Sequence, residues 1–173
     1  MCATGALAGE RALPSSVVEL ARGGQRAKLT SNVVVGVDRS PVSMTALHKG
    51  AEIAALLGSG LRVVHAVDLS DYPVDPDGDD WEEQARSSLE SERSAVSEAL
   101  ATYPGAWSFI VVRADPAVAL AAASRRFEAL MVVVGAHPGR WHRLGHMGGH
   151  SVAQRLVERC PCPVLVVGCP KPG

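Results

Sequence analysis

The chain has 173 residues, of which 47% are hydrophobic, and its formal net charge at pH 7 is −1. That length supports one substantial core, whereas two ordinary domains would each be small. The apolar runs, such as Leu130 to Val134, have the length of a buried strand and fall far short of the roughly 20 residues of a membrane-spanning helix. Residues 1–11 lack the basic start and apolar stretch of a secretory signal. We therefore expect a cytoplasmic protein that does not engage a membrane.

Aromatic and cysteine content exclude two further classes of protein. Aromatic residues make up 4% of the chain, which argues against nucleic-acid modules that stack bases on exposed rings. The four cysteines are Cys2, Cys160, Cys162 and Cys169, and this lopsided placement does not indicate a disulfide framework. Cys160 and Cys162 could supply two thiolates to a metal, but a closed zinc site needs four ligands, so we expect small, buried apolar cysteines.

Strand-like and helix-like segments alternate along most of the chain. β-branched and apolar runs predict five strands, at Asn32 to Val37, Leu61 to Val67, Trp107 to Val112, Ala129 to Val134 and Pro163 to Val167. Between them the sequence predicts helices at Pro41 to about Leu57, Asp80 to Ala101, Ala117 to Phe127 and Ser151 to Arg159. Ser40 before Pro41, and Asp115 before Pro116, have the pattern of an N-cap followed by proline at the first helical position.

This alternation predicts an α/β fold, a doubly wound five-stranded parallel sheet with helices on both faces. We place the domain at residues 32–168, after a mobile extension of residues 1–31 and before a tail of residues 169–173. Within the extension, Ser16 to Arg22 could form one or two helical turns. A ligand in such a fold lies outside the carboxyl ends of the strands, which here are Asp38, His65 to Val67, and the chain from Gly135 onward.

Two of these residues have alternative interpretations. Asp38 could bind a ribose or an adenine edge, or it could form an Asx-turn with Ser40 at the start of the helix. His65 has apolar neighbours, so we interpret it as a core histidine whose polar atoms are satisfied rather than as a catalytic base.

Short motifs in a fixed order resemble those of the universal stress protein family. They are Val34 to Ser40 (VVGVDRS), Val63 to Val67 (VVHAV), Asp115 to Ala117 (DPA), Val132 to Gly135 (VVVG), Ser151-Val152 and Pro161 to Val167 (PCPVLVV). The resemblance covers roughly residues 32–168. It implies the fold shared with adenine nucleotide α-hydrolases, a role in the stress response and a homodimer, which we expect to form through the last strand.

The resemblance also implies a nucleotide site, because some members of the family bind ATP, with Mg²⁺ where the phosphates require it. Their pattern after the fourth strand is Gly, two residues, Gly, nine residues, Gly, then Ser or Thr. The candidate binding residues in this sequence are Gly36, Asp38, Ala66, Val134, Gly135, Gly139, Gly149, Ser151 and Val152.

The glycine loop departs from that pattern at two positions and in length. Pro138 stands where the second glycine is expected and His150 where the last one is, and the loop is two residues longer. Proline has no N–H to offer a phosphate, although Ser151 and Val152 at a helix start can still present theirs. Binding of ATP or another adenine nucleotide, and an interaction module that binds no nucleotide, therefore both remain open.

The sequence contains no recognisable catalytic or metal-binding motif. His142, His146 and His150 recur every four residues, but intervening glycines disfavour the helix that would align them, so we predict no metal site and keep a metal-responsive module as an alternative. We also predict no catalytic residue. A second alternative is a weak ATPase or an autophosphorylating enzyme, with Ser151 or Ser40 as the modified residue.

Overall fold

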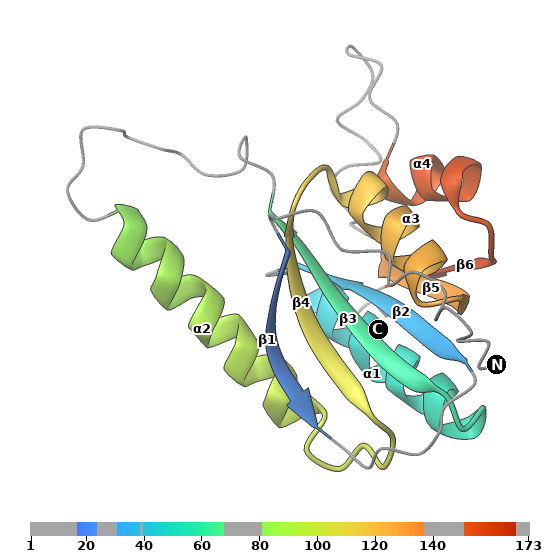
Figure 1. Cartoon of the computed structure of the whole chain (residues 1–173), viewed down its shortest axis with the longest axis horizontal. Coiled ribbons are helices and arrows are strands. Elements are labelled where there is room, and N and C mark those ends of the chain that lie inside the picture. The colour runs from blue at the N-terminus through green and yellow to red at the C-terminus, as the bar shows by residue number, and fades with distance from the viewer. Residues whose placement is uncertain (1–16, 24–30, 39, 68–80, 137–150, 169–173) are drawn as a thin grey trace, which may run out of the picture.

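The computed structural model describes residues 17–23, 31–38, 40–67, 81–136 and 151–168 (Figure 1). Its strands and helices follow one another in a regular α/β order after an initial strand. They are β1 (Val17–Gly23), β2 (Asn32–Val37), α1 (Pro41–Leu56), β3 (Gly60–Val67), α2 (Trp81–Ala99), β4 (Trp107–Arg113), α3 (Pro116–Arg126), β5 (Ala129–Gly135), α4 (Val152–Arg159) and β6 (Val164–Val167).

The strands form one sheet in the order β1-β4-β3-β2-β5-β6. Five of these strands, β4, β3, β2, β5 and β6, run parallel to one another, which confirms the predicted doubly wound parallel sheet. The chain moves from β2 outward to β3 and β4, then returns to the other side of β2 to form β5 and β6. The strand order therefore reverses between β2 and β5, where an α/β sheet of this type leaves a crevice.

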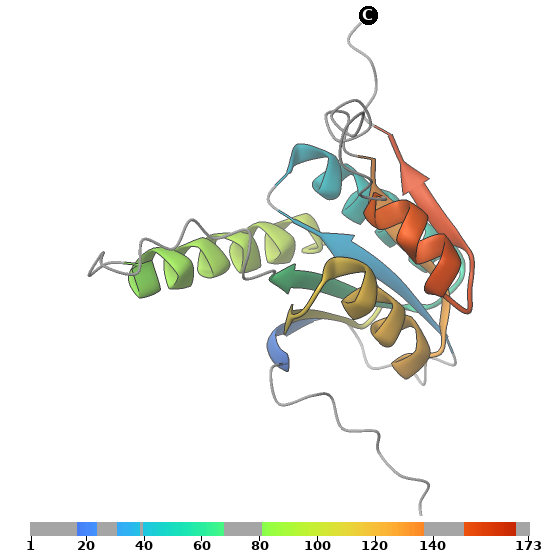
Figure 2. The same ribbon diagram turned by 90° about the horizontal axis from the view of Figure 1, so that it is seen from above.

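Helices cover both faces of the sheet, so successive residues of the central strands are buried on opposite sides. Val33 and Val35 of β2 belong to a core that includes residues of α1 and α2, and Val34 belongs to a second core with α3 and α4. Figure 2 shows α1 and α3 on opposite sides of β2. A strand buried on both faces has no polar side to expose, which explains why four of the six residues of β2 are valine.

An antiparallel sixth strand extends the sheet at its β4 edge. Val17 pairs with Val112 and Gly23 with Trp107, with an irregularity between Glu19 and Ala21. The predicted helical turns over Ser16 to Arg22 are therefore wrong, because pairing with β4 decides the conformation of this segment over its local pattern. The strand also lies within the segment that we expected to be a separate extension. It occupies backbone groups of β4 that would otherwise form an open edge.

The other elements begin and end within one or two residues of the predicted positions. No helix in the described ranges is long and apolar enough to cross a lipid bilayer.

The packing of α1 on β2 depends on a glycine in the middle of the helix. Gly50 is buried, and a Cβ added there would lie 2.4 Å from Cγ2 of Val35. Val35 is itself completely buried, and its β-branched side chain has little freedom to rotate away. The close approach of α1 to the sheet therefore requires the absence of a side chain at this position.

We expect Gly50→Ala to lower the free energy of unfolding by about 1–3 kcal/mol through overpacking. Helix propensity alone would raise the free energy of unfolding, since alanine is favoured over glycine by about 1 kcal/mol in a helix interior. Urea unfolding measures the change, and Ala55→Gly at an exposed position of α1 serves as the propensity control. A stabilised Gly50→Ala variant would contradict this account of the packing.

Candidate functional site

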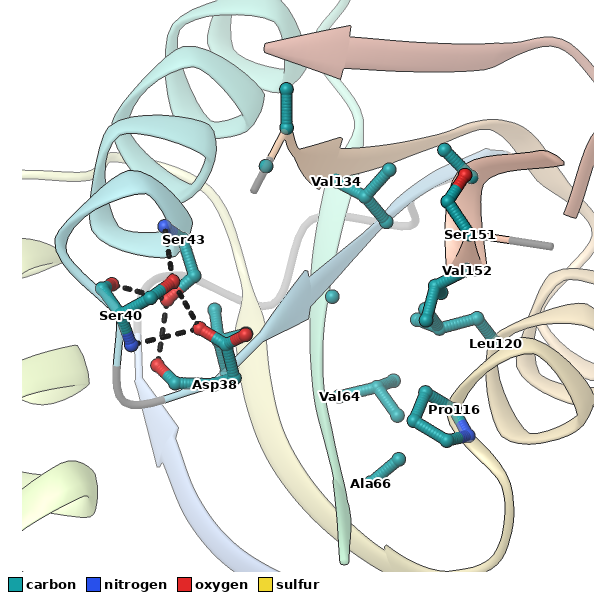
Figure 3. A pocket seen from close by; sticks show the side chains of 15 residues that line it. Asp38, Ser40, Ser43, Val64, Ala66, Pro116, Leu120, Val134, Ser151 and Val152 are labelled. Atoms are coloured by element: carbon teal, nitrogen blue, oxygen red, sulfur yellow. Dashed lines mark hydrogen bonds between the residues drawn. The ribbon is translucent and has the colours of Figure 1, made fainter. Parts of the chain in front are cut away.

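A cavity opens at the carboxyl ends of β2, β3 and β5, where the strand order reverses (Figure 3). The start of α1 borders it on one side, and the starts of α3 and α4 border it on the other. Its lining consists of Gly36, Val37, Asp38, Ser40, Ser43, Val64, Ala66, Pro116, Leu120, Val134, Gly135, Ala136, Ser151, Val152 and Ala153. This is the position at which open α/β sheets bind ligands.

Every predicted binding residue that the structure describes lines this cavity. These residues are Gly36, Asp38, Ala66, Val134, Gly135, Ser151 and Val152. Gly139 and Gly149 lie outside the described residues, as do the loop histidines and the two departures from the glycine pattern at Pro138 and His150.

The apolar part of the lining comes from β3, β5 and α3. Val64 and Ala66 are two residues apart on β3 and therefore point to the same face of the sheet, toward Leu120 of α3 (Figure 3). Gly36 of β2 lies beside Val64 in the floor that the sheet gives the cavity. A Cβ added to Gly36 would lie 2.8 Å from Cδ1 of Leu120 and 3.2 Å from Cγ1 of Val134. The absence of a side chain at Gly36 therefore keeps space between the sheet and α3.

Asp38 and two serines form a hydrogen-bonded group where β2 leads into α1. The backbone N–H of Ser40 donates to Asp38 Oδ1 at 2.8 Å, and the Ser40 hydroxyl donates to the same oxygen. The Ser43 hydroxyl donates to the Asp38 carbonyl at 2.6 Å, and Ser40 Oγ accepts from the Ser43 N–H as the N-cap. The Asx-turn with Ser40, one of the two alternatives for Asp38, is therefore present, and the Asp38 side chain is also exposed at the cavity.

The opposite rim of the cavity is the start of α4. Ser151 is its N-cap and accepts from the N–H of Gln154 at 3.2 Å, while the Ser151 N–H donates to Gln154 Oε1 at 2.9 Å. This reciprocal capping box fixes the direction in which α4 leaves the loop. It also means that a ligand binding to the Ser151 N–H must displace the Gln154 side chain.

An ion pair joins the starts of the two helices on this face. Arg155 of α4 donates to Asp115 Oδ2 at 2.7 Å, and Asp115 Oδ1 accepts from the Val118 N–H at 3.1 Å as the N-cap of α3. Burial raises the pKa of Asp115, but these hydrogen bonds outweigh it, so the pKa lies below its ordinary value. The pair holds α3 and α4 together beside the cavity.

His65 lies on the other face of the sheet, away from the cavity. Its exposed fraction is 8%, and Nδ1 lies 2.9 Å from Glu92 Oε1 of α2 and 3.3 Å from the Val37 carbonyl. The interpretation of His65 as a core histidine is therefore confirmed. Our expectation that His65 to Val67 as a group would reach the ligand is wrong, because strand alternation brings only Ala66 to the cavity.

Sequence reasoning missed much of the wall that α3 contributes. Pro116 and Leu120 line the cavity four residues apart, as expected of one face of a helix. The Asp115-Pro116 signal located the start of this helix, but only the three-dimensional structure shows that the helix packs over β3, β2 and β5. Among the described residues, the structure brings together no group of three or more side chains suited to hold a metal ion.

Comparisons with known proteins agree on one family. The family model described as the Universal stress protein family matches residues 30–168. A solved structure of a protein from that family, from Burkholderia pseudomallei, is 30% identical with a TM-score of 0.51, and the match covers 79% of this chain and 95% of that one.

Two further solved structures are similar and contain a nucleotide. A universal stress protein in complex with cAMP is 25% identical, with a TM-score of 0.57 and coverage of 79% of this chain and 96% of that one. A universal stress protein from Archaeoglobus fulgidus in complex with dAMP is 21% identical, with a TM-score of 0.53 and coverage of 80% and 98%, which supports the fold alone. No curated protein matches the chain.

The contact between β3 and α2 generates a prediction about stability. We expect His65→Leu to lower the free energy of unfolding by about 3 kcal/mol, because it leaves the buried Glu92 carboxylate without its nitrogen neighbour. Urea unfolding measures the loss. The double variant His65→Leu/Glu92→Leu removes both polar groups and should recover much of it, whereas additive losses would show that the two side chains do not act as a pair.

Proposed function

The chain belongs to the universal stress protein family, and on that premise we propose that it is a small dimeric binding module of the stress response that holds an adenine nucleotide. The proposed site is the cavity at the carboxyl ends of β2, β3 and β5. The observation that carries the proposal is the division of this cavity into an apolar wall, formed by Val64, Ala66 and Leu120, and two polar rims, at Asp38 and at the start of α4.

The apolar wall suits the base of the nucleotide. Val64, Ala66 and Leu120 offer a surface without charge against which a flat purine ring can pack. The related protein solved with cAMP, at 25% identity, supports an adenine base as the ligand.

The polar rims suit the rest of the nucleotide. The Asp38 carboxylate lies at the rim formed by β2 and α1, where it can accept hydrogen bonds from ribose hydroxyls. Phosphates would then point toward the start of α4, where the helix dipole and the backbone N–H groups favour negative charge. ATP would bind there together with Mg²⁺.

A second candidate function is autophosphorylation or slow ATP hydrolysis. It is favoured by the contact between the Ser40 hydroxyl and the Asp38 carboxylate at the rim, since a carboxylate that accepts this proton can act as a general base. Ser151 is less suitable for this role, because its hydroxyl contacts the backbone N–H of Gln154, which cannot take up the proton as the Asp38 carboxylate beside Ser40 can.

Thermal unfolding with millimolar nucleotide tests the binding proposal. We expect ATP with Mg²⁺, ADP, AMP or cyclic AMP to raise the midpoint, since a ligand at 100 times its Kd adds about 2.7 kcal/mol. Asp38→Ala should abolish the shift. Asp38→Asn is the matched variant, because its amide oxygen can keep the turn with Ser40 while it loses the charge.

The absence of a shift with any nucleotide would count against the proposal and favour a module that binds no nucleotide. Phosphate released from ATP above a heat-inactivated control would favour the enzymatic alternative. Mass spectrometry of Ser40→Ala tests whether phosphate is transferred to this serine. If it is, the added mass of a phosphate should be seen in the wild-type protein and not in the variant.

We propose that the dimer forms through β6, the edge strand of the described sheet beside β5. Val166 of this strand is 38% exposed, and Leu165 is partly buried against the core of the α1 and α2 face. An open apolar edge is suited to pair with the same strand of a second copy.

Light scattering after size exclusion should then give twice the 18.1 kDa mass of the chain. Val166→Lys should shift the protein toward the monomer, because it places a charge at the paired edge. Val118→Lys, at an apolar position of α3 that is 44% exposed, is the matched control and should leave the dimer intact. A wild-type monomer would contradict the proposal.

A further inference from the structure

An arginine and an aspartate meet between the two helices that border one side of the cavity. Asp115 directly precedes Pro116, which lines the cavity. On α4, Arg155 lies four residues after Ser151 and three after Val152, and both of these line the cavity as well. Positions three and four apart share a face of a helix, and long side chains lean toward its N-terminus. The Arg155 side chain therefore reaches back along α4 toward the rim proposed for the phosphates.

The ion pair uses little of the hydrogen-bonding capacity of the arginine. Nη1 of Arg155 donates to Asp115 Oδ2 at 2.7 Å, whereas Nε is buried and has no acceptor among the described residues. The side chains of Arg155 and Asp115 are 31% and 32% exposed, so a solute can reach the pair. A guanidinium has five N–H donors and can hold two oxygens of one phosphate. A buried donor without an acceptor is unfavourable, so a new position that gives Nε an oxygen would be stabilised.

The charges around the cavity favour a cation at this point when the ligand is an anion. Among the described residues that line the cavity, Asp38 alone has a charged side chain. Burial raises the pKa of Asp115, but hydrogen bonds from Arg155 and from the Val118 N–H bring it below its ordinary value. Asp115 is therefore a second carboxylate near the ligand at neutral pH. Both carboxylates repel a phosphate, and Arg155 is the positive group that lies against one of them.

We propose that Arg155 is a phosphate-binding residue and that Asp115 is the internal anion from which a bound nucleotide takes it over. This inference rests on the nucleotide site proposed above. On binding, the guanidinium exchanges Asp115 Oδ2 for phosphate oxygens, while Asp115 Oδ1 continues to accept from the Val118 N–H as the N-cap of α3. The competition acts on the phosphate alone, so it distinguishes AMP from adenosine, which has none.

Four forms of the full-length chain test this exchange: wild type, Arg155→Met, Asp115→Asn and the double variant. Isothermal titration calorimetry measures their affinities for AMP and for adenosine. We expect Arg155→Met to weaken AMP binding about tenfold, since it removes charged hydrogen bonds to the phosphate. Asp115→Asn should strengthen AMP binding about fivefold, because it frees the guanidinium while the amide oxygen still caps α3. Adenosine should bind to all four forms equally.

The double variant separates direct contact from a general effect of charge. It loses one positive and one negative group, so an effect transmitted only through space would cancel and leave wild-type affinity. Direct contact predicts that the double variant binds AMP more weakly than the wild type, as Arg155→Met does. Arg159→Met removes the same charge from the last turn of α4, remote from the cavity, and should bind AMP like the wild type.

Weaker AMP binding by Asp115→Asn would overturn the proposal, because it is the result expected if the ion pair only holds α3 and α4 in place. Wild-type affinity of Arg155→Met or of the double variant would also overturn it. If no form binds AMP, the nucleotide site itself is contradicted, and this inference with it. Thermal unfolding without ligand verifies that each variant is folded, and Arg155→Gln replaces Arg155→Met if the methionine variant fails to fold.

Discussion

Burial of the sheet on both faces is the constraint on which the rest of the structure depends. Parallel strands covered by helices require crossover connections, and all the carboxyl ends then lie at one edge of the sheet. Because the chain returns across β2 to form β5, the loops after these strands diverge and leave a cavity between them. Gly36 keeps the floor of the cavity clear, and the pair of Asp115 and Arg155 holds the two helices beside it.

Much of this arrangement could be predicted from local patterns. The valine-rich β2 has the composition of a central strand, and the structure buries it on both faces. The cap-then-proline signals at Ser40 and Asp115 correctly located the starts of α1 and α3. β1 could not be predicted in this way, because its conformation comes from the unpaired edge of β4, which is distant in sequence. The hydrophobic periodicity of a segment does not reveal which distant segment it will pair with.

The site shows the same division between local and long-range information. Asp38 and Ser151 could be found from their places after strands and before helices, and both line the cavity. The partner of His65 could not be found from the sequence. It is Glu92 on α2, a helix that packs on the face of the sheet opposite the cavity. Pro116 and Leu120 become part of the site only through the strand order, which sets α3 over β3, β2 and β5.

The most direct test of the account is a titration with AMP followed by backbone amide NMR spectra. The same spectra show whether AMP binds and which residues it affects. We predict chemical-shift changes at Gly36, Ala66, Gly135 and Val152, which line the cavity, and none at Val96 of α2 on the opposite face. Changes confined to the α1 and α2 face, or no change at saturating AMP, would contradict a nucleotide site at the carboxyl ends of the strands.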